Sequence, residues 1–399
     1  MTEVEETLRR TLGHAAEQAP RLPALLSQRL ERIHRRRRER ARIALAAAAV
    51  VLVGAGAVLR GGDTITAVPA TGRDLAEAPA EQVEKVWPEA VRTIPAKAPD
   101  GVPWRPQTFI DDGTLLMEAQ NDDAPGQKSA VYAYDLDAGT PRKIADVPAP
   151  EGTVGFGNGY AVGGGHVVWW TGTKDSVAHL WTVPLDGGTP KIVADQRLTT
   201  TDDGSGVDRI AVANDKIVFS LSSTGGVFTV PLGGGTVEPV QGGTGMHLLA
   251  WPWIGAPGRG GEPHGTDYAR IQNVETGETS TAVIRPGEAV RSCGVTICLG
   301  ATAEGAAFFR NRDGSSQKNV PGIVALTDPP TQNRFYISVY GEGKPVGVGL
   351  YDLDTGRSGD LSVPGEGTFI RPPSTDWTGR LISYTLGDDL YLIDLSKIR

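Results

Sequence analysis

Short apolar segments separated by turn residues recur along most of this chain. The stretch Leu180–Val193, LWTVPLDGGTPKIV, has close variants at Val131–Ile144, Val227–Val240 and Leu350–Val363. In each, apolar side chains alternate before an acidic or glycine turn, which predicts a strand followed by a tight reversal. Other segments are apolar throughout, such as HVVWWTG at 166–172. Continuous apolar runs are typical of strands that are covered on both faces.

The glycines that end these turns define a repeat. They are spaced by 49, 47, 42, 37 and 42 residues, and a seventh copy without the glycine, DLYLIDLSK, places Asp394 42 residues after Asp352. Short strands repeating every 40 to 50 residues or so predict propeller blades. We therefore expect an all-β, seven-bladed β-propeller, with six blades as the alternative because the fifth copy, FFRNRDGSS, is the weakest. The aligned glycines, which should adopt positive φ, are Gly139, Gly188, Gly235, Gly277, Gly314 and Gly356.

The chain ends directly after the third strand of the last repeat, which would leave an unpaired edge. The segment Ala90–Ala96, AVRTIPA, resembles the fourth strands of other repeats, such as RKIADV. We expect it to complete the last blade and close the ring.

A membrane segment is predicted before the repeats. Ile43–Leu59 has 17 residues without a polar side chain, enough for roughly 25 Å of helix, and Arg42 and Arg60 could reach the headgroups. Eight arginines in 29–42 place the N-terminal side in the cytoplasm. An uncleaved single-pass helix is preferred over a cleaved signal peptide, because 42 residues precede the apolar run.

The predicted organisation therefore has four parts: a cytoplasmic Arg-rich helical segment at 1–42, a transmembrane helix at 43–59, a flexible stalk at 60–85 and a propeller ectodomain at 86–399. Residues 1–42 carry a net charge of +5 and residues 61–399 a net charge of −14. An acidic body of this size would repel nucleic acid. Residues 1–41 could dock a cytoplasmic partner or lie on anionic membrane lipid.

Segments 166–194 and 375–396 resemble the blades of TolB-type, WD-like propellers, although the WD dipeptide and the Gly-His signature of true WD repeats are absent. The order of Arg-rich helix, anchor and propeller resembles a class of uncharacterised membrane proteins of high-GC bacteria. The resemblance to TolB implies a role in the cell envelope through protein binding, and it transfers no site residue to this chain.

Catalytic and metal-binding motifs are scarce. The sequence contains no G-x-S-x-G, H-E-x-x-H or Walker motif. GFGNGY at 155–160 resembles a dinucleotide loop only superficially, and STDWTG at 374–379 approaches a sialidase Asp-box but occurs once. No cofactor or metal is expected, because none of the four histidines that follow the predicted membrane helix has a second ligand at metal spacing; these are His166, His179, His247 and His264.

Acidic pairs and tryptophans offer weaker candidates. Asp135/Asp137 and Asp352/Asp354 could suggest calcium, but their recurrence at hairpins indicates turn residues. Most of the eight tryptophans should pack between blades. Trp251 and Trp253, beside a glycine-rich loop, are the predicted ligand contacts.

The only cysteines, Cys293 and Cys298, lie in RSCGVTICLG. On one straight strand they would point to opposite faces, but a tight reversal over Gly294–Ile297 would place them opposite each other on paired strands. We expect a disulfide, which an extracytoplasmic location favours, with two buried free thiols as the alternative.

Three functions follow from these observations. The leading one is a membrane-anchored extracytoplasmic propeller, not an enzyme, that binds or senses a protein, peptide or glycan. The alternative is a transmembrane signalling regulator whose residues 1–41 restrain a cytoplasmic factor in the manner of an anti-sigma protein; a pull-down with this segment distinguishes it. The third is a propeller hydrolase or lyase, which requires acids or histidines that converge at the channel.

Overall fold

The computed structural model describes residues 78–119, 129–156, 159–198, 206–222, 224–258, 265–320, 323–324, 329–341, 346–364, 370 and 372–399. The predicted cytoplasmic segment, the transmembrane helix and most of the stalk lie outside these residues. Within them, no helix has the length and apolar character needed to cross a membrane.

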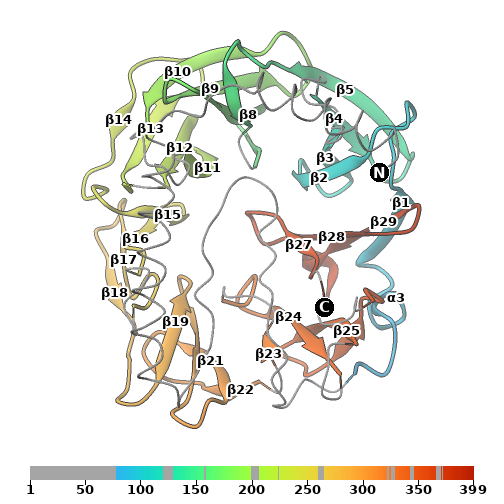
Figure 1. Cartoon of the computed structure of the whole chain (residues 1–399), viewed down its shortest axis with the longest axis vertical. Helices are drawn as coiled ribbons and strands as arrows, with labels where there is room; N and C mark the ends of the chain where they lie inside the picture. Colours follow the sequence, from blue (N-terminus) through green and yellow to red (C-terminus); the bar gives the residue numbers. More distant parts are fainter. Residues whose placement is uncertain are drawn as a thin grey trace, which may run out of the picture. The chain divides into compact units, whose positions relative to one another are not determined.

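Seven antiparallel sheets follow one another along the chain as the blades of a β-propeller (Figure 1). The prediction of seven blades is confirmed, and the six-bladed alternative is excluded. In blades 1, 3, 4 and 7 the first strand lies nearest the centre of the ring and the fourth lies at the rim (Figure 1). In blade 2 the first strand is split into two segments that both pair with β8.

The strand bounds, blade by blade, are as follows. Blade 1 contains β2 (Trp104–Phe109), β3 (Thr114–Ala119), β4 (Ser129–Asp135) and β5 (Thr140–Val147). Blade 2 contains β6 (Thr153–Phe156), β7 (Ala161–Gly163), β8 (His166–Thr173), β9 (Val177–Pro184) and β10 (Lys191–Arg197). Blade 3 contains β11 (Val207–Ala213), β12 (Lys216–Leu221), β13 (Val227–Pro231) and β14 (Glu238–Pro239). Blade 4 contains β15 (His247–Ala250), β16 (Trp253–Gly255), β17 (Arg270–Asn273) and β18 (Thr279–Thr281).

The remaining blades are built in the same way. Blade 5 contains β19 (Ala289–Cys293), β20 (Ile297–Ala301), β21 (Ala307–Asn311) and β22 (Lys318–Asn319). Blade 6 contains β23 (Ile323–Val324), β24 (Phe335–Tyr340), β25 (Gly347–Asp352) and β26 (Ser358–Asp360). Blade 7 contains β27 (Ser374–Thr375), β28 (Leu381–Leu386), β29 (Asp389–Asp394) and β1 (Val91–Pro95). The helix α3 (Val83–Val86) precedes β1, and the 3-10 turn η1 (Leu395–Lys397) follows β29.

Apolar side chains of the middle strands pack between neighbouring blades. In β8 every residue after His166 is buried, as the apolar run HVVWWTG predicts for a strand covered on both faces. Trp169 of this strand stacks on Trp181 of β9, with ring centroids 6.2 Å apart and planes 4° from parallel. These tryptophans pack in the core, as expected for most of the tryptophans in this chain.

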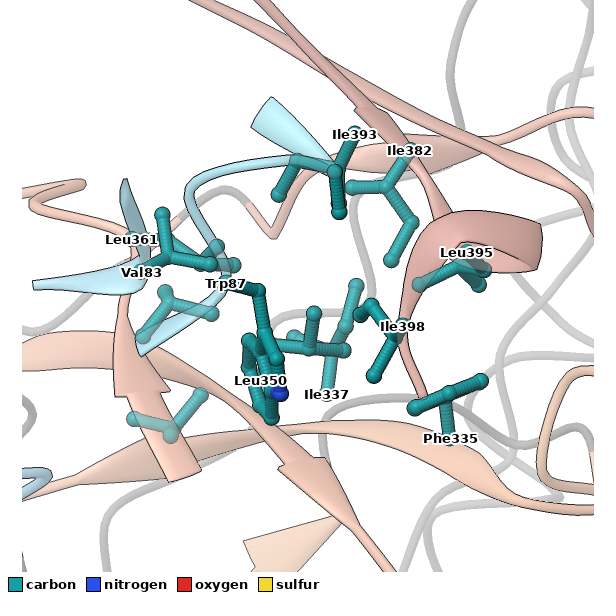
Figure 2. Packing of buried hydrophobic residues seen from close by; sticks show 13 residues of the cluster. Val83, Trp87, Phe335, Ile337, Leu350, Leu361, Ile382, Ile393, Leu395 and Ile398 are labelled. Atoms are coloured by element: carbon teal, nitrogen blue, oxygen red, sulfur yellow. The ribbon is translucent and has the colours of Figure 1, made fainter. Parts of the chain in front are cut away.

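The N-terminal segment closes the ring. Strand β1 pairs with β29 from Val91↔Ile393 to Pro95↔Asp389, which confirms the prediction that this segment completes the last blade. Ahead of it, Val83 and Trp87 pack into one cluster with residues of blades 6 and 7 (Figure 2). Val83 is fully buried, so the packed domain begins before the predicted boundary at residue 86.

The turn residues behave as their chemistry predicts. All six aligned glycines have positive φ, between 65° and 152°. The Asp135 carboxylate accepts hydrogen bonds from the backbone N–H groups of Asp137 (2.9 Å) and Ala138 (2.8 Å). Asp352 accepts one from the N–H of Asp354 (3.0 Å). The first aspartate of each pair therefore stabilises its turn.

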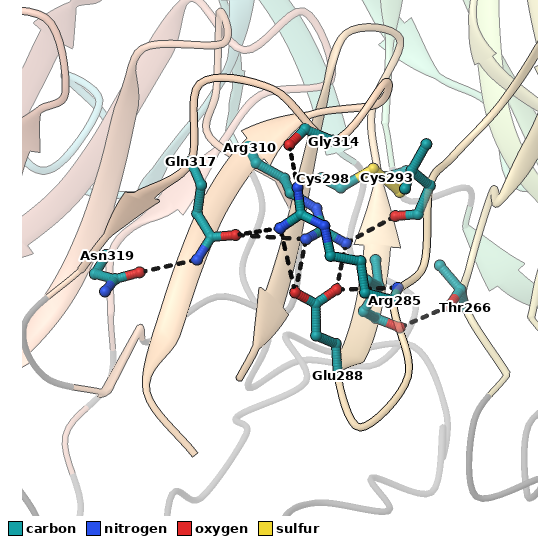
Figure 3. Close-up of polar contacts among 11 residues, drawn as sticks. Thr266, Arg285, Glu288, Cys293, Cys298, Arg310, Gly314, Gln317 and Asn319 are labelled. Atoms are coloured by element: carbon teal, nitrogen blue, oxygen red, sulfur yellow. Dashed lines mark hydrogen bonds and ion pairs between the residues drawn. A yellow bond between two sulfur atoms is a disulfide. The ribbon is translucent and has the colours of Figure 1, made fainter. Parts of the chain in front are cut away.

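The two cysteines form the predicted disulfide. Cys293 of β19 lies opposite Cys298 of β20, with Cα atoms 4.0 Å apart (Figure 3). Both side chains are buried beside Phe308. The disulfide cross-links the two strands of the β19–β20 hairpin in blade 5.

Candidate functional site

The turn between β27 and β28 brings an exposed tryptophan to the centre of the ring. Trp377 is 47% exposed, and the turn that carries it points inward from blade 7 (Figure 1). The Arg209 guanidinium of blade 3 lies 5.1 Å from its ring centroid. A Cβ atom at Gly159 of blade 2 would clash with the indole Nε1. Because blade 7 neighbours only blades 6 and 1 around the ring, these contacts join it to two blades that are not its neighbours.

Hydrogen bonds to both neighbouring blades fix this turn. The Asp376 carboxylate accepts one from the Thr108 hydroxyl of blade 1 (2.8 Å) and another from the backbone N–H of Leu381 (2.9 Å). On the other side, the Thr331 hydroxyl of blade 6 donates to the carbonyl of Gly379 (2.8 Å). The indole of Trp377 is therefore presented by an anchored turn.

Gly159 is positioned by a buried polar network. The hydroxyl of the next residue, Tyr160, donates to the Glu118 carboxylate (2.8 Å), which also accepts from Ser129 (2.5 Å) and Gln107 (3.3 Å). Burial and the neighbouring carboxylate raise the pKa of Tyr160 well above its usual value, so it remains a donor. The network fixes the chain where it passes Trp377.

A second polar cluster joins blades 3 and 4 beside Arg209. Asp208 of β11 accepts hydrogen bonds from His247 Nδ1 of β15 and from the Ser220 hydroxyl (2.5 Å). Burial favours a higher pKa for Asp208, but the hydrogen bonds from His247 and Ser220 outweigh it, and the net pKa is lowered. The carboxylate is thus ionised at neutral pH.

The order of bonds in this cluster is not that of a nucleophilic triad. Ser220 donates to the carboxylate and accepts from the backbone N–H of Leu248 (3.0 Å), whereas an activated serine must donate to the imidazole. Arg209 donates to the carbonyl of Leu249 on β15. Together these contacts clamp the first strands of blades 3 and 4.

The predicted ligand contacts Trp251 and Trp253 are both half-buried, in the turn before β16 and at its start. The Trp251 indole donates to Glu275 (3.0 Å) and packs against the apolar core between blades 3 and 4. No aromatic contact between described residues joins either of them to Trp377. Their role in ligand binding stays a prediction.

The sequence contained a signal for Trp377, because it lies within STDWTG, the stretch that approaches an Asp-box. Its inward direction was not foreseen, since Gly159 and Arg209 are far from it in the chain.

The described histidines have other partners. His179 Nδ1 lies 2.6 Å from Asp195, and His166 Nδ1 lies 2.8 Å from the carbonyl of Gly164. His264 lies outside the described residues. Within the part of the chain that the structure describes, no group of three or more His, Cys, Asp or Glu side chains could hold a metal ion.

No protein-family model and no curated protein matches this chain. Among solved structures, the β-propeller domain of the Trilobed protease from Pyrococcus furiosus is 10% identical, with a TM-score of 0.41 over 74% of this chain and 90% of that one. The C-terminal WD40 domain of Sif2 is 11% identical, with a TM-score of 0.41 over 78% and 84%. TolB from Acinetobacter baumannii is 16% identical, with a TM-score of 0.34, and the match covers 55% of this chain and 54% of TolB. The chain is thus similar to TolB and WD40 propellers in fold alone.

Proposed function

We propose that this protein is a membrane-anchored, extracytoplasmic binding module without catalytic activity, and that its protein, peptide or glycan ligand binds at the centre of the ring. The observation that carries the proposal is Trp377, which is 47% exposed on a turn anchored to both neighbouring blades. A large aromatic side chain on an anchored turn offers contact area at low entropic cost.

The test compares two tryptophans. Full-length protein in detergent is immobilised as wild type, Trp377→Ala and Trp251→Ala, and is offered peptides and glycans released from cell envelopes as separate fractions. We expect Trp377→Ala to lose affinity by about tenfold, the effect of roughly 1.4 kcal/mol of lost aromatic contact. Its melting temperature should stay that of the wild type, because the side chain is half exposed.

The Trp251→Ala variant tests the other predicted ligand contact, and it should retain the ligand if binding is centred on Trp377. Equal capture by wild type and Trp377→Ala, or loss of capture only in Trp251→Ala, contradicts binding at Trp377.

A further inference from the structure

Arginines of the blade interfaces and arginines of the first strands differ in their partners. Arg310 forms two hydrogen bonds to Glu288, of 2.8 and 2.7 Å, inside blade 5 (Figure 3). Arg334 and Arg380 are likewise paired with carboxylates of their own blades. In contrast, Arg209 of β11 and Arg291 of β19 form no ion pair within the described part of the chain. Both lie on the first strands of their blades.

Among the described residues, no carboxylate forms an ion pair with the Arg209 guanidinium. The carboxylate of the adjacent Asp208 accepts hydrogen bonds from His247 and Ser220. Asp376, in the turn of Trp377, accepts from Thr108 and from backbone N–H groups. The only contacts that hold the Arg209 guanidinium among the described residues are a carbonyl oxygen and the indole face. Neither contact cancels its charge.

Arg291, on the first strand of blade 5, is a second arginine without an ion pair among the described residues. Its side chain is exposed, yet surrounding protein lowers its pKa by desolvation with no opposing contribution from a partner. A positive group that is close to protein on several sides but open to water attracts anions more strongly than one on a convex surface.

We propose that the centre of the ring binds an acidic sugar unit of a glycan, with the sugar ring on Trp377 and its carboxylate on Arg209; this rests on the proposed function. Arg209 lies over the indole ring, 5.1 Å from its centroid, and 47% of the Trp377 residue remains exposed. A uronic acid offers an apolar ring face and a carboxylate on one rigid unit, which matches a flat aromatic group beside a guanidinium. An acidic peptide carries its carboxylates on flexible chains without such a face.

The charge of the remaining protein limits the length of this ligand. Residues 61–399 carry a net charge of −14, so a long polyanion would be repelled outside the ring's centre. The recognised feature is therefore a short or terminal acidic unit. Because a single guanidinium–carboxylate pair contributes most of the charge attraction, binding should weaken as salt is added.

The experiment is calorimetric titration of the full-length protein in detergent with glucuronic-acid and galacturonic-acid tetrasaccharides. Carboxyl-reduced forms of the same sugars and a glutamate tetrapeptide are the comparison ligands. We expect at least one acidic sugar to bind, its reduced form to bind about tenfold more weakly, and the peptide to bind no better than the reduced sugar. Arg209→Gln should lose about tenfold in affinity, and Arg209→Lys should also bind more weakly than wild type, because an ammonium group lacks the planar stacking and the paired donors of a guanidinium.

Controls separate binding from folding. Arg92→Gln removes an exposed arginine at the rim, where Arg92 pairs with Asp137 at 3.1 Å, and should bind the acidic sugar like wild type. Melting temperatures identify any variant that loses the Arg209–Leu249 contact and unfolds. No binding of either acidic sugar at millimolar concentration, equal binding of the reduced sugars, or preference for the peptide overturns this inference. The proposed function still stands in each case if capture of an envelope ligand depends on Trp377.

Discussion

At the scale of single residues, arginine–aspartate latches join the second and third strands of two blades. Arg334 directly precedes β24 and donates two hydrogen bonds to Asp352, the last residue of β25, at 2.8 and 2.7 Å. Arg380 directly precedes β28 and bonds Asp394, the last residue of β29, at 2.9 and 2.7 Å. Such bidentate pairs fix geometry as well as charge.

The ion pair between Arg334 and Asp352 should make the free energy of unfolding depend on pH in the acidic range. Burial favours a higher pKa for Asp352, but the hydrogen bonds from Arg334 and Thr355 outweigh this effect. The pKa is therefore lowered from the usual 3.8 to about 2. A carboxyl group whose pKa is lower in the folded state than in the unfolded state stabilises the fold when the pH is above its unfolded-state pKa. This stabilisation is lost as the pH falls through the folded-state pKa. We therefore expect Asp352→Asn to lower the free energy of unfolding at pH 7 by on the order of 1–2 kcal/mol, with the difference vanishing between about pH 4 and pH 2.

Denaturant unfolding at several pH values measures this difference. Asn can still accept the bonds from Arg334 Nε and the Asp354 N–H through its Oδ1, but its NH2 group cannot accept those from Arg334 Nη2 and the Thr355 hydroxyl, so the substitution removes the charge and these two bonds. Asp354→Asn is the matched control, because its carboxylate is mostly exposed and lies 3.7 Å from Arg334; it should change stability little. A difference between wild type and Asp352→Asn that is constant from pH 7 to pH 2 contradicts the latch.

At the scale of elements, the middle strands and their hairpin glycines were predictable, because each carries a local pattern. An apolar run specifies a strand covered on both faces, and a glycine of positive φ specifies where the chain reverses. Several outer and inner strands were not predictable. Strands β14, β22, β23 and β27 have two residues each, which is too short to show an alternation. Their positions depend on the neighbouring strands.

Closure by β1 predicts where the ring is vulnerable. Ile94 is 7% exposed in a core cluster between blades 7 and 1, whereas its neighbour Thr93 is exposed. Ile94→Ala should cost about 2–4 kcal/mol in unfolding free energy, and Thr93→Ala less than about 0.5 kcal/mol. Deletion of residues 86–97, which also removes Trp87, should abolish the cooperative transition. A deletion variant that melts at the wild-type temperature would show that the ring does not need this strand.

At the scale of the whole molecule, the candidate site depends on contacts between distant segments, which a local sequence pattern cannot predict. Trp377 meets Gly159 and Arg209 only because the seven blades close into a ring, which brings the inner turn of blade 7 to residues of blades 2 and 3. Trp251 and Trp253 had the more suggestive sequence context, but neighbouring strands half bury both. Exposure at the centre is thus a property of the closed ring and not of the segment that provides the side chain.

The distribution of charge over the chain argues for its orientation in a membrane. Residues 1–42 carry a net charge of +5 and residues 61–399 a net charge of −14, on either side of the apolar segment 43–59. Because positive flanks stay in the cytoplasm, the propeller should lie outside. Protease added to intact cells should then digest the propeller and spare a tag placed before residue 42, whereas permeabilised cells should lose both. The buried Cys293–Cys298 bond is an internal control: outside the cytoplasm it should block alkylation in denatured material until reductant is added. A protected propeller with two freely alkylated cysteines, or a mature protein that begins after residue 57, would overturn the anchored orientation.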